Sequence, residues 1–99
     1  MKFLALSDTH GKHWKLIPDN TDILLTHGPP FGVLDFIAGS NVGCEQLLKR
    51  VKKIKPRVHL LGHIHEANGS LDAEDTRFIN ASILDDHYQI KYRPFSFEL

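Results

Sequence analysis

Three groups of side chains that bind metals follow apolar runs in this 99-residue sequence. They are Asp8 with His10 after residues 3–6, His27 after residues 23–25, and His63 with His65 after residues 58–61. Short apolar runs are typical of buried strands. Because ligands of open parallel α/β sheets bind beyond the carboxyl ends of the strands, we expect the three groups to meet at one sheet edge. The sequence therefore predicts a metal site assembled from distant segments.

The five candidate ligands are one carboxylate and four imidazoles, which is more than a single tetrahedral zinc ion needs. They indicate two ions, and mixed nitrogen and oxygen ligands suit manganese, iron, zinc or nickel. Within each pair the residues are two apart, so an extended turn would project both the same way. We expect Gly62 to permit a close approach or an unusual backbone angle before His63. A single histidine after a strand is more often a hydrogen-bonding residue, but three groups together favour ligation.

Length and composition predict a single domain over residues 1–99, with an ordinary hydrophobic content of 41%. The formal net charge of zero gives no bulk field that attracts nucleic acid or membrane. Cys44 is the only cysteine, which excludes an internal disulfide and a thiolate-rich zinc site. We therefore expect a cytoplasmic protein with no membrane partner. The apolar start stops at Ser7, too soon for a signal peptide.

The hydrophobic pattern predicts strands at residues 3–6, 22–26 and 58–61, and a helix at residues 43–54 capped by Ser40 or Asn41. Residues 33–41 are expected to form a loop or a short helical turn, and residues 77–79 and 87–92 a later hairpin. The connection over residues 11–21 is at the lower limit for a parallel crossover. Either the crossover is minimal or the first two strands are not neighbours.

The sequence resembles the calcineurin-like metallophosphoesterases. The motifs that carry the resemblance are Ser7-Asp8-Thr9-His10-Gly11, Thr26-His27-Gly28-Pro29-Pro30 and Gly62-His63-Ile64-His65-Glu66. Asn80-Ala81-Ser82 is similar to a segment of one small branch of that family. The resemblance implies an α/β fold, here a reduced αββα sandwich with parallel core strands and a C-terminal hairpin. It also implies hydrolysis of phosphomonoesters or phosphodiesters by metal-activated water.

By the same resemblance, Asp8, His10 and His65 would hold a first metal, and His27 and His63 a second, with manganese the expected ion. The family's Gly-Asp and Gly-Asn-His motifs are missing before His27, which indicates an internal deletion, natural or engineered. Without the bridging carboxylate we expect one firm and one weak metal site. No catalytic side chain is assigned, because the family's catalytic histidine is absent.

The first functional hypothesis is a metal-dependent phosphoesterase of reduced activity, acting on phosphodiesters such as small or cyclic nucleotides. The alternative is a catalytically weak remnant that binds metal or phosphate as an interaction module. Sheet edges and apolar faces left uncovered by the deletion predict a homodimer or a larger homo-oligomer.

Several further residues allow two interpretations. The basic run over residues 49–57 is either a phosphate-binding or nucleic-acid-binding surface or, as we favour, a solvated helix face. His13 and Trp14 could line the site, although surface and packing roles are favoured for them. Asp35 and Glu66 are candidates to orient histidines. We expect Cys44 in the core and His59 on a buried sheet face.

Overall fold

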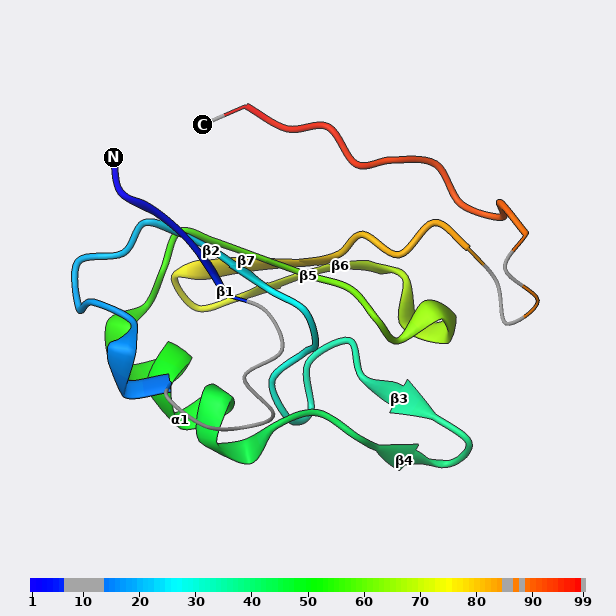
Figure 1. Ribbon diagram of the computed structural model, residues 1–99, viewed down its shortest axis with the longest axis horizontal. Helices are drawn as coiled ribbons and strands as arrows, with labels where there is room; N and C mark the ends of the chain where they lie inside the picture. The colour runs from blue at the N-terminus through cyan, green and yellow to red at the C-terminus, as the bar shows by residue number, and fades with distance from the viewer. Residues whose placement is uncertain (7–13, 85–86, 88, 99) are drawn as a thin grey trace.

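The computed structural model describes residues 1–6, 14–84, 87 and 89–98. Its main sheet has the strand order β1-β2-β5-β7-β6. The strands are β1 (Phe3–Leu6), β2 (Ile23–Thr26), β5 (Val58–Leu61), β7 (Thr76–Asn80) and β6 (Gly69–Ala73). The first four are parallel, and β6 pairs antiparallel with β7. The carboxyl ends of the parallel strands therefore meet at one edge, at the right of the sheet in Figure 1.

The first two strands are direct neighbours, with Phe3 opposite Ile23 and Leu6 opposite Thr26. The short connection is thus a minimal crossover, which contains the 3₁₀ helix η1 (Trp14–Leu16). Both strands are short and have apolar residues on both faces, as a parallel strand between two covering layers requires.

One face of the sheet is covered by α1 (Glu45–Ile54) and η1, which lie below it in Figure 1. Leu47 and Val51, one turn apart on α1, pack with Leu24, Leu61 and Phe78 from the strands. Truncating a buried leucine of this kind to alanine costs about 2–5 kcal/mol. This cluster fixes the helix against the sheet and thereby fixes the positions of the strand ends.

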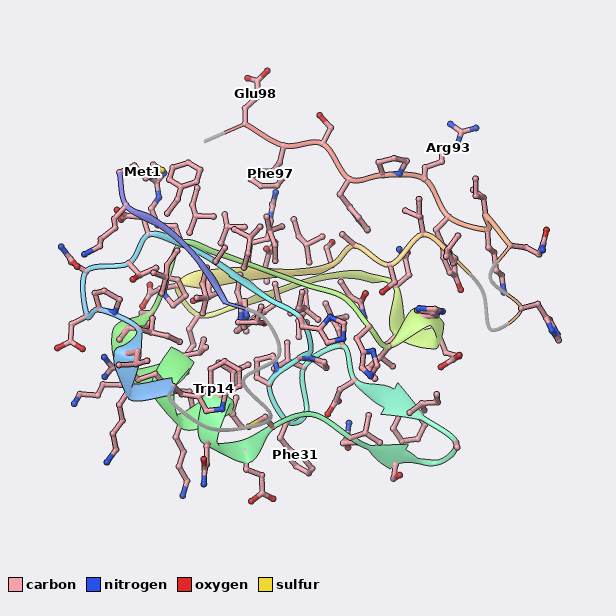
Figure 2. The ribbon with its side chains drawn as sticks, viewed as in Figure 1. Met1, Trp14, Phe31, Arg93, Phe97 and Glu98 are labelled. Carbon is pink, nitrogen blue, oxygen red and sulfur yellow. The ribbon has the colours of Figure 1, made fainter. Side chains whose placement is uncertain are left out.

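The helix begins at an unexpected cap. Cys44 has an extended backbone, and its sulfur accepts a hydrogen bond from Leu47 N, at 3.4 Å. The predicted caps, Ser40 and Asn41, are wrong, because both belong to strand β4. Cys44 Sγ also accepts a hydrogen bond from the indole N–H of Trp14 at 3.2 Å. Both side chains pack against the core as expected, and Figure 2 shows Trp14 beside α1.

The opposite face of the sheet is covered more thinly. Ile23, Val58 and Ile79 form a second cluster, against which Phe97 of the C-terminal segment packs. Figure 2 shows Phe97 turned from that segment toward the sheet. On the same face Phe3 keeps 63% of its surface exposed. This apolar face is therefore only partly covered within the chain.

Residues 33–41 contain a small hairpin rather than a helical turn. It pairs β3 (Phe36–Ile37) with β4 (Ser40–Asn41) around Ala38 and Gly39. Both turn residues have positive φ, 52° and 84°, as two-residue hairpin turns require. The alternation of this short segment was too brief to signal a strand pair.

The C-terminal hairpin is present, but its strands differ from those predicted. β7 covers residues 77–79 as expected, yet its partner is β6, which lies before it in the sequence. In residues 87–92, the described part shows an isolated bridge from Ile90 to Leu84 and no strand. The error arose because residues 66–74 are rich in turn formers, although Glu74 and Asp75 alone form the turn. The mixed α/β fold, with its parallel core and antiparallel hairpin, is confirmed.

Candidate functional site

Sheet register places His27 and His63 side by side. Leu25 pairs with Leu60, and the ladder continues past both strands with a hydrogen bond from Gly62 N to His27 O at 3.1 Å. The two imidazole ring centroids lie 4.5 Å apart with an interplanar angle of 41°. Both residues are exposed to solvent at the carboxyl edge of the sheet. Two histidines separated by 36 positions in the sequence are thus neighbours on the surface where the fold class binds its ligands.

The backbone at His63 turns sharply. Its φ is +71°, a left-handed value that costs a non-glycine residue about 1–2 kcal/mol. The prediction gave Gly62 either a close approach or an unusual backbone angle. The unusual angle lies instead at His63, and a Cβ at Gly62 would make ordinary contacts, 3.5 Å from Ser82 Oγ and 3.8 Å from His27 O. Strained backbone of this kind concentrates at functional sites. Here it directs the His63 ring outward beside His27, while the following Ile64 is buried.

His65 does not repeat the expected extended geometry. It begins the 3₁₀ helix η2 (His65–Ala67) and is half-buried. Glu66 is exposed on the same helix. The extended turn that we expected over His63 and His65 is therefore absent.

Beneath this edge, His59 is fully buried in β5 and faces the helix-covered side of the sheet, as expected. Thr26 Oγ1 donates to Gly28 O at 2.7 Å and lies 2.9 Å from His59 Nε2. Since the hydroxyl has one proton, Nε2 of His59 must carry a proton and donate to Thr26. Burial lowers the pKa of His59 to about 3, so the ring is neutral. These two hydrogen bonds, the relay from His59 through Thr26 to Gly28, hold the backbone on both sides of His27.

Asp35 anchors the loop that follows His27. It is fully buried, and its carboxylate accepts from Gly32 N at 2.9 Å, Gly43 N at 2.7 Å and Asn41 Nδ2 at 2.7 Å. Both oxygens serve the loop itself, so the role of Asp35 is to close the 32–43 segment. The sequence suggested a residue that orients a histidine and did not reveal this loop-closing role.

The remaining predicted ligands, Asp8 and His10, lie in residues 7–13, outside the described residues, as does His13. Within the described ranges, no group of three or more His, Cys, Asp or Glu residues is placed to hold a metal. Of the five predicted ligands, the described residues include His27, His63 and His65.

The separation of the two imidazole rings bears on whether they can share one cation. Metal–nitrogen bonds of ~2.0–2.1 Å require that two imidazole ligands of one zinc ion be close neighbours. The observed 4.5 Å agrees with that requirement. Imidazole ligands suit zinc, iron and nickel, which are three of the four ions expected from the sequence.

The basic run lies on the outer face of α1. Lys49, Lys52, Lys53 and Lys55 are exposed, while Leu47 and Val51 on the opposite face are buried. Arg50 is different, because its guanidinium bonds to Ile17 O and to Asp19 at 2.8 Å, tying the helix to the crossover. The lysines therefore lie on a solvent-exposed face opposite the apolar stripe, as both interpretations of the run require. No helix in the described ranges is long and apolar enough to cross a membrane.

Comparison with known proteins supports the family suggested by the motifs. The chain is 44% identical over 84 residues to UPF0046 protein K07C11.7 of Caenorhabditis elegans, covering 85% of this chain. It is 43% identical over 89 residues to human Metallophosphoesterase domain-containing protein 1, covering 87% of this chain. A second Caenorhabditis elegans protein, UPF0046 protein C25E10.12, is 38% identical over 92 residues. No family model matches the chain.

The fold, the strand-end histidines and these relatives together define the class of protein. The chain belongs to the calcineurin-like metallophosphoesterase family, in the branch of the UPF0046 and metallophosphoesterase domain-containing proteins. It spans 29% and 27% of the length of the first two relatives named above.

Proposed function

We propose that the chain is a metal-dependent phosphoesterase in which His27 and His63 bind a divalent cation at the carboxyl edge of the sheet. The single observation that carries this proposal is the 4.5 Å separation of the two imidazole rings. The metallophosphoesterase name of a relative 43% identical over 89 residues supports the same reaction class. Phosphodiesters, including small or cyclic nucleotides, are the proposed substrates.

The two histidines have a defined part in this proposal. Each would supply one imidazole nitrogen, and the relay from His59 through Thr26 to Gly28 keeps the backbone around His27 fixed. The outward turn at His63 leaves its ring accessible from solvent, where a phosphate ester would approach. When bound, a divalent cation lowers the pKa of water and neutralises phosphate charge.

Asp8, His10 and His65 remain the proposed ligands of a second cation, and manganese remains the expected ion. The Gly-Asp and Gly-Asn-His motifs are absent from the sequence, and we propose that an internal deletion removed them. One metal site is then weaker than the other. We expect the weaker site to be the His27–His63 pair, because it has only two protein ligands. Slow turnover follows, because a bridging carboxylate and the leaving-group histidine would both be missing. The cytoplasmic location is part of the same proposal.

We also propose that the chain forms a homodimer through the thinly covered side of its sheet. β1 is an edge strand of the main sheet, and its Phe3 is 63% exposed on that side. Leu25 of the neighbouring strand adds apolar surface, 37% exposed. Edge strands with exposed apolar side chains favour association.

Hydrolysis of a chromogenic phosphodiester tests the proposed reaction. Turnover should appear on addition of Mn²⁺, vanish with a chelator, and fall at least tenfold in His63→Ala. Asp72→Asn, which alters an exposed ion pair with Arg77 on β7, is the matched control and should retain wild-type turnover. Turnover that is independent of metal, or equal in wild type and His63→Ala, would contradict the proposal.

A further inference from the structure

Asn80, the last residue of β7, is fully buried at the carboxyl edge of the sheet. Its Nδ2 donates to Ile64 O at 3.0 Å and to Leu34 O at 3.2 Å. Its Oδ1 accepts from Ser82 N at 3.1 Å. One side chain therefore bonds to three segments, those that follow β2, β5 and β7.

Two of these segments carry the candidate ligands. Ile64 lies between His63 and His65 in the sequence, so the hydrogen bond to its carbonyl holds the backbone that joins the two histidines. Leu34 belongs to the segment that follows His27, and Asp35 closes that segment onto Gly43. Leu34 and His63 both have positive φ, +51° and +71°, and such conformations persist where surrounding contacts hold them.

We propose that Asn80 is a positioning residue for the metal site, holding the His63 turn at a fixed distance from the His27 loop. This inference rests on the proposed function, which supplies the reason for fixing the two rings. Asn80 is not itself a ligand in this account, because its amide nitrogen and its oxygen are both engaged in the interior. None of the five predicted ligands lies on β7, so Asn80 is a further residue of the site.

The chemistry of the position demands a carboxamide. Two backbone carbonyls need two N–H donors from one short side chain, and the Ser82 amide needs an acceptor. A carboxylate of the same shape would keep the acceptor and place an oxygen against both carbonyls. Asn80→Asp therefore removes the link between the two ligand segments while leaving the volume of the side chain unchanged.

The matched control lies at the other end of the same strand. Thr76 is buried at the start of β7, and its hydroxyl donates to Pro56 O at 2.6 Å. Thr76→Val removes one buried hydrogen bond from β7 without approaching the histidines. Both variants should be less stable than wild type, so loss of stability alone does not distinguish them.

The test uses a readout of geometry that needs no metal. In NMR spectra of the metal-free chain, ring protons of His27 and His63 should show a mutual nuclear Overhauser effect in wild type and in Thr76→Val. In Asn80→Asp this effect should disappear, and the amide signals of residues 63–65 should shift. Asn80→Ser, which introduces no charge, serves in its place if the aspartate variant does not fold.

Metal affinity provides the second readout. Mn²⁺ should bind at least tenfold more weakly to the Asn80 variant and within about twofold of wild type to Thr76→Val, since outer contacts to ligands typically contribute 10–100-fold. If wild type binds no metal but the ring contact still depends on Asn80, the proposed function fails and the positioning role stands. A ring contact that persists in the Asn80 variants overturns the inference.

Discussion

The backbone amide of Gly62 donates to the carbonyl of His27 at 3.1 Å, which extends the parallel ladder between β2 and β5 beyond the ends of both strands. This bond brings the residue before His63 against His27 and explains why their rings are neighbours. The candidate site is therefore a direct product of sheet register. A slip of register would separate the rings, because successive residues point to opposite faces.

Shared binding of one cation predicts coupling between the two histidines. His27→Ala and His63→Ala should each weaken Mn²⁺ binding by about tenfold or more. The double variant should bind only slightly more weakly than either single variant, since the first substitution already destroys the shared site. Titration calorimetry measures the three affinities. If the losses of binding free energy in the two single variants add up in the double variant, the two rings act separately.

Burial of His59 predicts a stability that falls in mild acid. Its pKa is about 3 in the folded chain and 6.5 as the unperturbed value, so between these pH values only the unfolded chain takes up the proton. Stability should be unaffected by this group above about pH 7.5 and should decrease by about 2 kcal/mol between pH 7.5 and pH 5.

Urea denaturation with a chelator present, which removes any metal effect, checks this pH dependence. His59→Phe should be less stable at pH 7.5, because it loses the bond to Thr26, and should show a flatter pH dependence. A slope identical to that of wild type would mean that His59 takes up its proton equally in the folded and the unfolded chain.

Gly43 is predicted to tolerate no side chain. A Cβ at this position would lie 2.3 Å from Pro30 O and 2.8 Å from Asp35 Oδ2. Gly43→Ala should therefore destabilise the chain by about 1–3 kcal/mol, as overpacking typically does. Gly28→Ala is the matched control, because a Cβ there meets nothing within 4 Å. Thermal unfolding compares the two, and equal midpoints would contradict the packing of this loop.

The proposed dimer predicts a sedimentation coefficient that depends on concentration. Wild type should sediment as a dimer or larger species at micromolar concentration, and Phe3→Lys should shift it toward monomer. Leu16→Lys changes a residue that is 68% exposed on η1 and should leave association unchanged. A compact wild-type monomer at these concentrations would contradict the proposal.

Much of the fold was predictable because its strands are short apolar runs with clear ends. The same pattern predicted that His27 and His63 would meet, since both follow such runs. The roles of Asn80 and Asp35 could not be predicted, because they depend on which backbone carbonyls and amides lie near these side chains in the folded chain. The β6 strand was not predicted because it begins with a glycine and has only one large apolar residue, Leu71, which is 41% exposed. The hydrogen-bond partners of Asn80 and Asp35 come together only when the chain folds.

Paramagnetic broadening by Mn²⁺ tests most directly whether His27 and His63 bind a cation together. In NMR spectra of the wild-type chain, Mn²⁺ added beyond the amount that fills the firmer site should selectively broaden the imidazole signals of both histidines. The backbone signals of residues 27–28 and 62–64 should broaden next. Signals of Asp72 and Asp75, on the β6–β7 hairpin, should be unaffected at the same ratio. Uniform broadening, or broadening that spares either histidine, would contradict the account.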